Sequence, residues 1–151
     1  MKFTPKKINT FLLFKLPAAF FTGVRVKSIS ESSAIVNVKY NWINKNPFKS
    51  LFWAVQGMAS ELSTGILVMR SINNSGEKVS MLVTNMSAVF TKKAIGKIQF
   101  KCNDGLLIEK AIEKAIQTKE GQTVIVKSEG IDEKGISVSK FEYEWSLKLK
   151  K

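Results

Sequence analysis

The stretch SLFWAVQGMASELSTGILVM, residues 50–69, is mostly apolar and carries a single ionisable side chain, that of Glu61. It is long enough to span a bilayer, but Glu61 lies near its centre among several hydroxyl side chains, and segments of alternating polarity flank it on both sides. We therefore predict a helix that a protein core encloses on most of its sides, and no membrane span. A lone carboxylate is costly to bury unless it is paired or protonated, so the position of Glu61 calls for an explanation.

Alternating polar and apolar residues on both sides of this helix predict half-buried β-strands. In the last strand the apolar positions change parity between Val138 and Phe141, which predicts a β-bulge near Ser139 and Lys140. Ile136 is expected to point inward together with Val138. Two strands are expected before the helix and four after it, at residues 24–28, 34–40, 79–90, 94–102, 123–128 and 136–149.

Two more helices are predicted. Thr4 and Pro5 suit the N-cap and first turn of a helix that ends at Pro17. We expect this helix to cover the domain, with binding to a membrane surface as the alternative. The apolar stripe of LLIEKAIEKAI, residues 106–116, predicts an extra helix between later strands, with Gly121 just past its end. Together these elements predict an α+β fold, with an antiparallel sheet around one dominant helix, in a single domain spanning residues 1–151.

The residue types present exclude several kinds of site. The chain has no histidine and one cysteine, Cys102, which excludes a histidine general base and any serine–histidine or cysteine–histidine pair, and disfavours a zinc site. We expect no metal and no cofactor. A single cysteine also excludes an internal disulfide and favours a reducing compartment, so we expect a cytoplasmic protein. Cys102 falls on the inward face of its strand, where a buried thiol is expected.

The 24 basic and 12 acidic side chains give a formal net charge of +12. Such an excess attracts polyanions, including nucleic acids, anionic lipids and phosphate-bearing ligands such as coenzyme A. The lysines are scattered, however, and no basic and aromatic strand motif of the RNA-binding kind is present. We interpret the charge as a solvated basic surface and expect no nucleic-acid partner, although association with nucleic acid stays open as a rival function.

The order of these elements, together with NKNPFKSLFWAVQGMASELSTGI at residues 44–66, resembles the hotdog fold. In that fold a curled antiparallel sheet wraps around one long central helix. The chain is similar over nearly its whole length to a bacterial family of thioesterase-like hotdog domains of unknown function. The resemblance implies a homodimer or a dimer of dimers, with clefts that form between protomers, and an acyl-thioester ligand such as acyl-CoA.

The resemblance also implies a set of site residues. Hotdog thioesterases bind the thioester carbonyl at the backbone N–H groups that begin the central helix, and a carboxylate on that helix attacks the thioester or activates water. The carboxylate here would be Glu61, whose pKa an apolar surround would raise. Thr64, three residues further along the helix, would position the water. Asn46 and Ser50 would donate hydrogen bonds to the carbonyl.

The chain departs from the better-known pattern of this fold, which is a histidine followed by two glycines at the helix entry. FKSLFW stands there instead, so Phe52 and Trp53 either obstruct the thioester or line an acyl tunnel. Structural alternatives stay open for each residue: a bond to a backbone group, or to a lysine or arginine across the dimer seam, for Glu61; a turn and capping role for Asn46; and an N-cap role for Ser50.

Thr64 is also open to an ordinary structural role in its helix. The three tryptophans are expected in the core or in an interface rather than in an acyl site: Trp42, Trp53 and Trp145. We therefore expect an acyl-CoA thioesterase, with a non-catalytic protein that binds acyl chains or lipid as the alternative.

Overall fold

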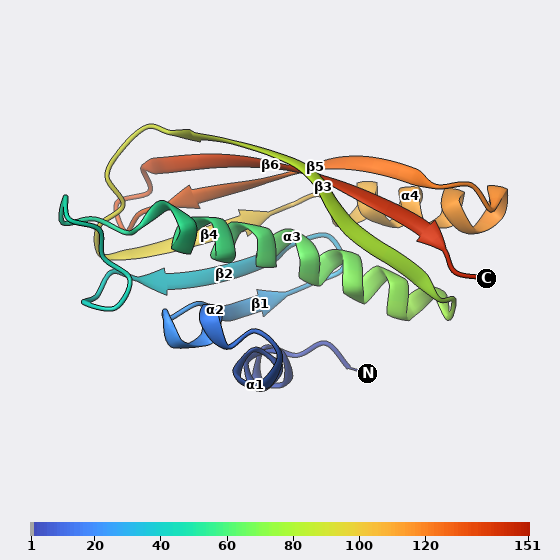
Figure 1. The fold of residues 1–151 in the computed structure, drawn as a ribbon, viewed down its shortest axis with the longest axis horizontal. Helices are drawn as coiled ribbons and strands as arrows, with labels where there is room; N and C mark the ends of the chain where they lie inside the picture. The colour runs from blue at the N-terminus through green and yellow to red at the C-terminus, as the bar shows by residue number, and fades with distance from the viewer. Residues whose placement is uncertain (1) are drawn as a thin grey trace.

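The computed structural model describes residues 2–151, which form an α+β fold with a curled antiparallel sheet (Figure 1). The predicted α+β class is confirmed. The helices within these residues are α1 (Pro5–Lys15), α2 (Pro17–Phe21), α3 (Trp53–Ser75) and α4 (Gly105–Thr118), and the strands are β1 (Arg25–Ile29), β2 (Ala34–Lys39), β3 (Val79–Phe90), β4 (Lys97–Cys102), β5 (Gln122–Ile131) and β6 (Ser137–Leu149).

The six strands are ordered β1-β2-β4-β5-β6-β3, and every neighbouring pair is antiparallel. β2 and β3 are consecutive strands in the sequence, yet they lie far apart in the sheet, and the long helix α3 connects them. β3 pairs along its whole length with β6, from Val79 opposite Leu149 to Phe90 opposite Ser139. Its other edge pairs with no strand among residues 2–151, so β3 is a long open edge.

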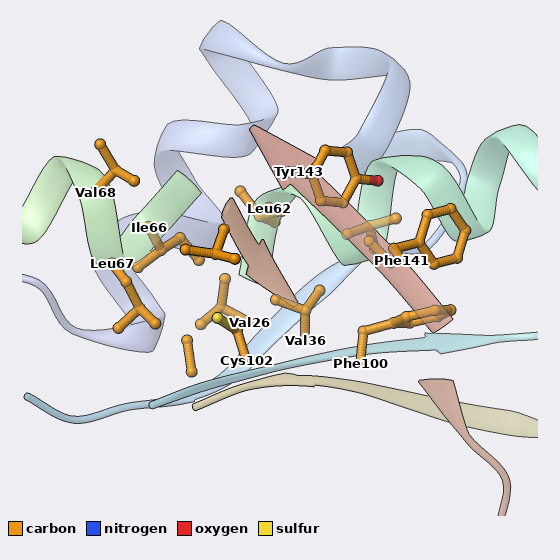
Figure 2. Packing of buried hydrophobic residues seen from close by; sticks show 14 of the residues in the cluster. Val26, Val36, Leu62, Ile66, Leu67, Val68, Phe100, Cys102, Phe141 and Tyr143 are labelled. Atoms are coloured by element: carbon orange, nitrogen blue, oxygen red, sulfur yellow. The ribbon is translucent and has the colours of Figure 1, made fainter. Parts of the chain in front are cut away.

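α3 packs against the sheet over most of its length, as Figure 1 shows. Ile66 and Val68 of α3 are fully buried, as are Val36, Phe100 and Phe141 of the sheet (Figure 2). This enclosure explains why the helix is apolar on most of its sides. No helix in the described part of the chain is long and apolar enough to cross a membrane.

The predicted bounds of the central helix were wrong at both ends. Residues before it form a tight loop that a β-bridge between Lys45 and Leu51 closes, so Ser50 lies inside the loop and is not the N-cap. The N-cap is Phe52, whose side chain caps nothing. At the other end the helix continues to Ser75, into the expected turn, and stops where Gly76 adopts a left-handed φ of 72° that suits glycine.

The predicted β-bulge in the last strand is confirmed one residue earlier than expected. On β5, Gly130 pairs with Ser139 and Ile131 pairs with Ser137, so Val138 is the extra residue of β6. Val138 and the next residue, Ser139, are both buried, which produces the change of parity. Ile136 was expected to point inward but lies before β6 and is exposed, because the strand begins only at Ser137.

The first helix is capped as predicted. Thr4 accepts a hydrogen bond from the backbone N–H of Lys7. After α1 the chain forms the short helix α2, which was not predicted. The Asn9 side chain accepts from the N–H of Val26 at 2.8 Å and donates to its carbonyl at 3.0 Å, so α1 is pinned to the edge strand β1.

α4 has the predicted apolar stripe, with Ile108, Ile112 and Ala115 buried, but its C-cap is Lys119 rather than a glycine near residue 121. Cys102 is fully buried as expected, and burial raises the pKa of its thiol to about 12, which leaves it unreactive at neutral pH.

Candidate functional site

A pocket of about 540 Å³ opens at the start of α3. The loop before α3 forms one wall, and the connection between β3 and β4 forms the other. Four of the residues predicted for the site line this pocket: Asn46, Ser50, Phe52 and Trp53. The entry of the central helix is therefore hollowed, as a ligand site there requires.

Asn46 is bound within its own loop. Its Oδ1 accepts hydrogen bonds from the N–H groups of Phe48 (2.9 Å) and Ser50 (3.2 Å). Its Nδ2 donates to Ser50 Oγ at 2.9 Å and to the carbonyl of Leu51 at 3.2 Å. The same amide thus holds together a turn in which Lys49 has a left-handed φ of 62°. Asn46 and Ser50 shape the pocket wall, and both Nδ2 donations of Asn46 go to the protein.

The N-terminus of α3 presents free hydrogen-bond donors. The N–H groups of Val55 and Gln56 both donate to the carbonyl of Phe52, at 2.9 and 3.3 Å. The N–H groups of Trp53 and Ala54 have no acceptor among residues 2–151, and no side chain caps the helix. Free N–H groups at a helix start carry partial positive charge and can bind a carbonyl oxygen or an anion.

Aromatic side chains surround this helix start. The rings of Phe52 and Trp53 meet edge to face with centroids 6.1 Å apart. Both rings are exposed in the single chain, Trp53 by 56%, and Trp42 in the same loop region is 78% exposed. Only Trp145 lies in the core as expected, at 4% exposure. The mouth of the pocket is therefore apolar and uncovered in one copy of the chain.

Glu61 does not line this pocket. It is half-buried on α3, and its carboxylate forms no hydrogen bond or ion pair with another described residue. Burial raises its pKa above the ordinary value. Burial also raises the pKa of nearby Tyr143 to about 12, and the charge of Glu61 adds to that rise. Within residues 2–151 no lysine or arginine neutralises Glu61.

Thr64 is buried, and its hydroxyl is committed to the protein. It donates to the carbonyl of Glu61 at 2.8 Å and accepts from Trp145 Nε1 at 3.0 Å. Further polar contacts join α3 to the sheet at the same level: Ser60 Oγ lies 2.6 Å from Tyr143 Oη, and Ser63 Oγ lies 2.7 Å from Ser128 Oγ. These contacts fix the rotation of α3 and hence the direction of Glu61.

Glu61 belongs to a half-buried face of α3. Ala54, Gly57, Met58 and Glu61 follow one another at helical spacing, and all four are half-buried while the residues between them are mostly buried. A Cβ added to Gly57 would have no heavy atom within 4 Å of it beyond its own stretch of helix. This face leaves room for a further surface to approach Glu61.

Gln56 lines the pocket and was missed from the sequence. It is 4% exposed, and its Oε1 has no hydrogen-bond partner. Its polarity within a strongly apolar helical turn was the signal that could have identified it.

Residues 5–147 match the model of a family described as a domain of unknown function, DUF4442. No curated protein matches the sequence.

Solved structures share the fold. A Pseudomonas aeruginosa protein described as a probable thioesterase of unknown function is 18% identical, with a TM-score of 0.82 and 97% of both chains covered. A putative thioesterase from Shewanella oneidensis is 9% identical, with a TM-score of 0.79 and the same coverage. A thioesterase from Haemophilus influenzae is 11% identical, with a TM-score of 0.70, covering 99% of this chain and 93% of the other. The expected resemblance to thioesterase-like hotdog proteins is confirmed.

Proposed function

Because the chain belongs to the DUF4442 family and shares the fold of thioesterases, we propose that it hydrolyses an acyl thioester, with acyl-CoA as the substrate class. The observation that carries the proposal is the pocket at the start of α3, which has an apolar mouth and is lined by Trp53 at the helix end where the N–H groups of Trp53 and Ala54 are free. An acyl chain suits the mouth, and a thioester carbonyl suits the donors.

In the proposed mechanism the two N–H groups bind the carbonyl oxygen and stabilise the negative charge that it gains during attack. Glu61 takes a proton from water while the water oxygen bonds to the thioester carbon. The resulting tetrahedral intermediate then expels the sulfur as a thiolate, which receives a proton, and the carboxylic acid product forms. A carboxylate with a raised pKa suits the role of general base, and this chain has no histidine to take it.

Glu61 lies outside the pocket of its own chain, so the proposal includes a second copy. In a homodimer or a dimer of dimers, the open face of α3 in one protomer would meet the pocket of its partner, and Glu61 would then face the bound thioester. The unpaired edge of β3 supports this arrangement, because it exposes Leu82 and Val89 along a strand of 12 residues. A long apolar edge strand requires a cover or a partner.

A non-catalytic acyl-binding protein is the second candidate. This function is favoured because the amide of Asn46 already donates both its hydrogen bonds within the protein, and because the bulky Phe52 and Trp53 stand at the helix entry. Such a protein would use the same pocket to hold an acyl chain without turnover.

Thiol release from a panel of acyl-CoA substrates separates the two functions. The wild-type protein is expected to release coenzyme A, and Glu61→Gln is expected to lower kcat by about 10²–10⁴-fold, the usual contribution of a general base. Glu113→Gln, an exposed substitution on α4, is the matched control and leaves the rate unchanged. Acyl-CoA binding without release of thiol would support the acyl-binding function, and equal rates for both variants would remove Glu61 from the mechanism.

A further inference from the structure

Gln56 differs from the other polar side chains that line the pocket. Its amide has no hydrogen-bond partner within the described residues. It is more than nine-tenths buried, and the Oε1 atom accepts no hydrogen bond. Buried polar atoms in proteins almost always have a partner, so an unpaired amide on a pocket wall points to a partner that the chain itself does not supply. The other polar side chains of the lining are all engaged with the protein: Asn46, Ser50, Thr91, Lys92 and Lys93.

Gln56 is also close to the donors at the helix start. It follows Trp53 by three residues, so the two lie on one face of α3. Side chains on a helix lean toward its N-terminus, which directs the Gln56 amide toward the free N–H groups of Trp53 and Ala54. The pocket lining therefore includes an uncommitted acceptor, Gln56, one helical turn from the free N–H groups at the start of α3.

The unpaired atom determines the kind of ligand. An amide oxygen requires an N–H or O–H donor, and a thioester group has none. Acyl chains carried on a pantetheine arm do have one, because an amide N–H follows the sulfur by two carbons. A helix rises about 4.5 Å between Trp53 and Gln56, which is comparable to the reach from a thioester carbonyl to that amide.

We propose that Gln56 recognises the pantetheine arm of the substrate by accepting a hydrogen bond from the amide nearest the sulfur, while the N–H groups that begin α3 hold the acyl carbonyl. The inference rests on the proposed function and deepens it, because it restricts the substrates to thioesters of pantetheine carriers. Gln56 is then a positioning residue that sets the place of the sulfur and takes no part in the bond changes.

The test is a binding measurement with two thioether ligands, neither of which contains a thioester bond. One is the octyl thioether of N-acetylcysteamine, which carries the amide N–H, and the other has an ester oxygen in its place. Wild-type protein is expected to bind the amide ligand about tenfold more tightly by calorimetry, the factor of one good hydrogen bond. Gln56→Met, which is similar in size and cannot accept that bond, is expected to bring the two affinities together.

Gln117→Met, on the exposed surface of α4, is the control and keeps the tenfold preference. Gln56→Met is also expected to have a melting temperature at or above that of the wild type, because it removes an unpaired buried amide. Equal binding of the two ligands by the wild type, absence of binding, or an unchanged preference in Gln56→Met would each overturn the inference. If the protein hydrolyses acyl-CoA but shows no preference for the amide ligand, the role of Gln56 is overturned and the proposed thioesterase function stands. If it prefers the amide ligand but hydrolyses no acyl-CoA, the role of Gln56 stands and the thioesterase function is overturned.

Discussion

Thr64→Val tests whether the hydroxyl of Thr64 holds α3 to the sheet. The Thr64 hydroxyl is the acceptor for Trp145 Nε1 at 3.0 Å, and both side chains are buried. Valine keeps the shape and a similar helix propensity, but it leaves the indole N–H without a partner. A buried donor that loses its acceptor costs about 1–3 kcal/mol, and we expect the free energy of unfolding to fall by that amount.

Urea denaturation followed by far-UV circular dichroism measures this change. Thr64→Ser keeps the hydroxyl and loses one methyl group, so it should cost about 0.8 kcal/mol. The decisive comparison adds Trp145→Phe, because valine at position 64 should cost almost nothing once the indole N–H is gone. A coupling energy of about 1 kcal/mol or more is expected from this double-mutant cycle. A coupling energy near zero would refute the reasoning, whatever the cost of each single substitution.

Three further predictions concern glycines and the lone carboxylate. Gly105→Ala should destabilise the protein by about 1–3 kcal/mol in thermal or urea unfolding, because a Cβ would lie 2.7 Å from Ser32 Cα; wild-type stability would contradict this. Gly57→Ala has free space and a helical position, so it should stabilise the isolated chain by up to about 1 kcal/mol, and weaken self-association if a partner packs on that face. Burial raises the pKa of Glu61, so folded protein keeps a proton that the unfolded chain releases, and stability falls as pH rises from the unfolded to the folded pKa. Glu61→Gln cannot ionise, so its stability relative to wild type should increase as the pH rises above the unfolded-state pKa of a glutamate, about 4.3; a pH-independent difference would contradict the prediction.

The resemblance identified two parts of the candidate site that lie in different places in the single chain. Asn46, Ser50, Phe52 and Trp53 do meet in one pocket. Glu61 lies further along α3 and does not line that pocket, since the position of a side chain around a helix depends on what the helix packs against. That Glu61 and the pocket residues form one catalytic site stays a prediction, and it requires a second copy of the chain in a dimer.

Local pattern alone predicted the strands, the long buried helix and a bulge in the last strand, because polarity with a period of two or 3.6 records which side of each element faces the core. The structure places that bulge at Val138, one residue before the expected Ser139. The tertiary structure decided what local pattern does not encode. Ser50 is of a residue type that caps helices, yet its hydrogen bonds to Asn46 hold it in a loop and the helix begins later. β3 crosses to the far edge of the sheet, and the amide of Gln56 is left unpaired on a pocket wall. Both outcomes depend on contacts between residues far apart in sequence, and these contacts exist only in the folded chain.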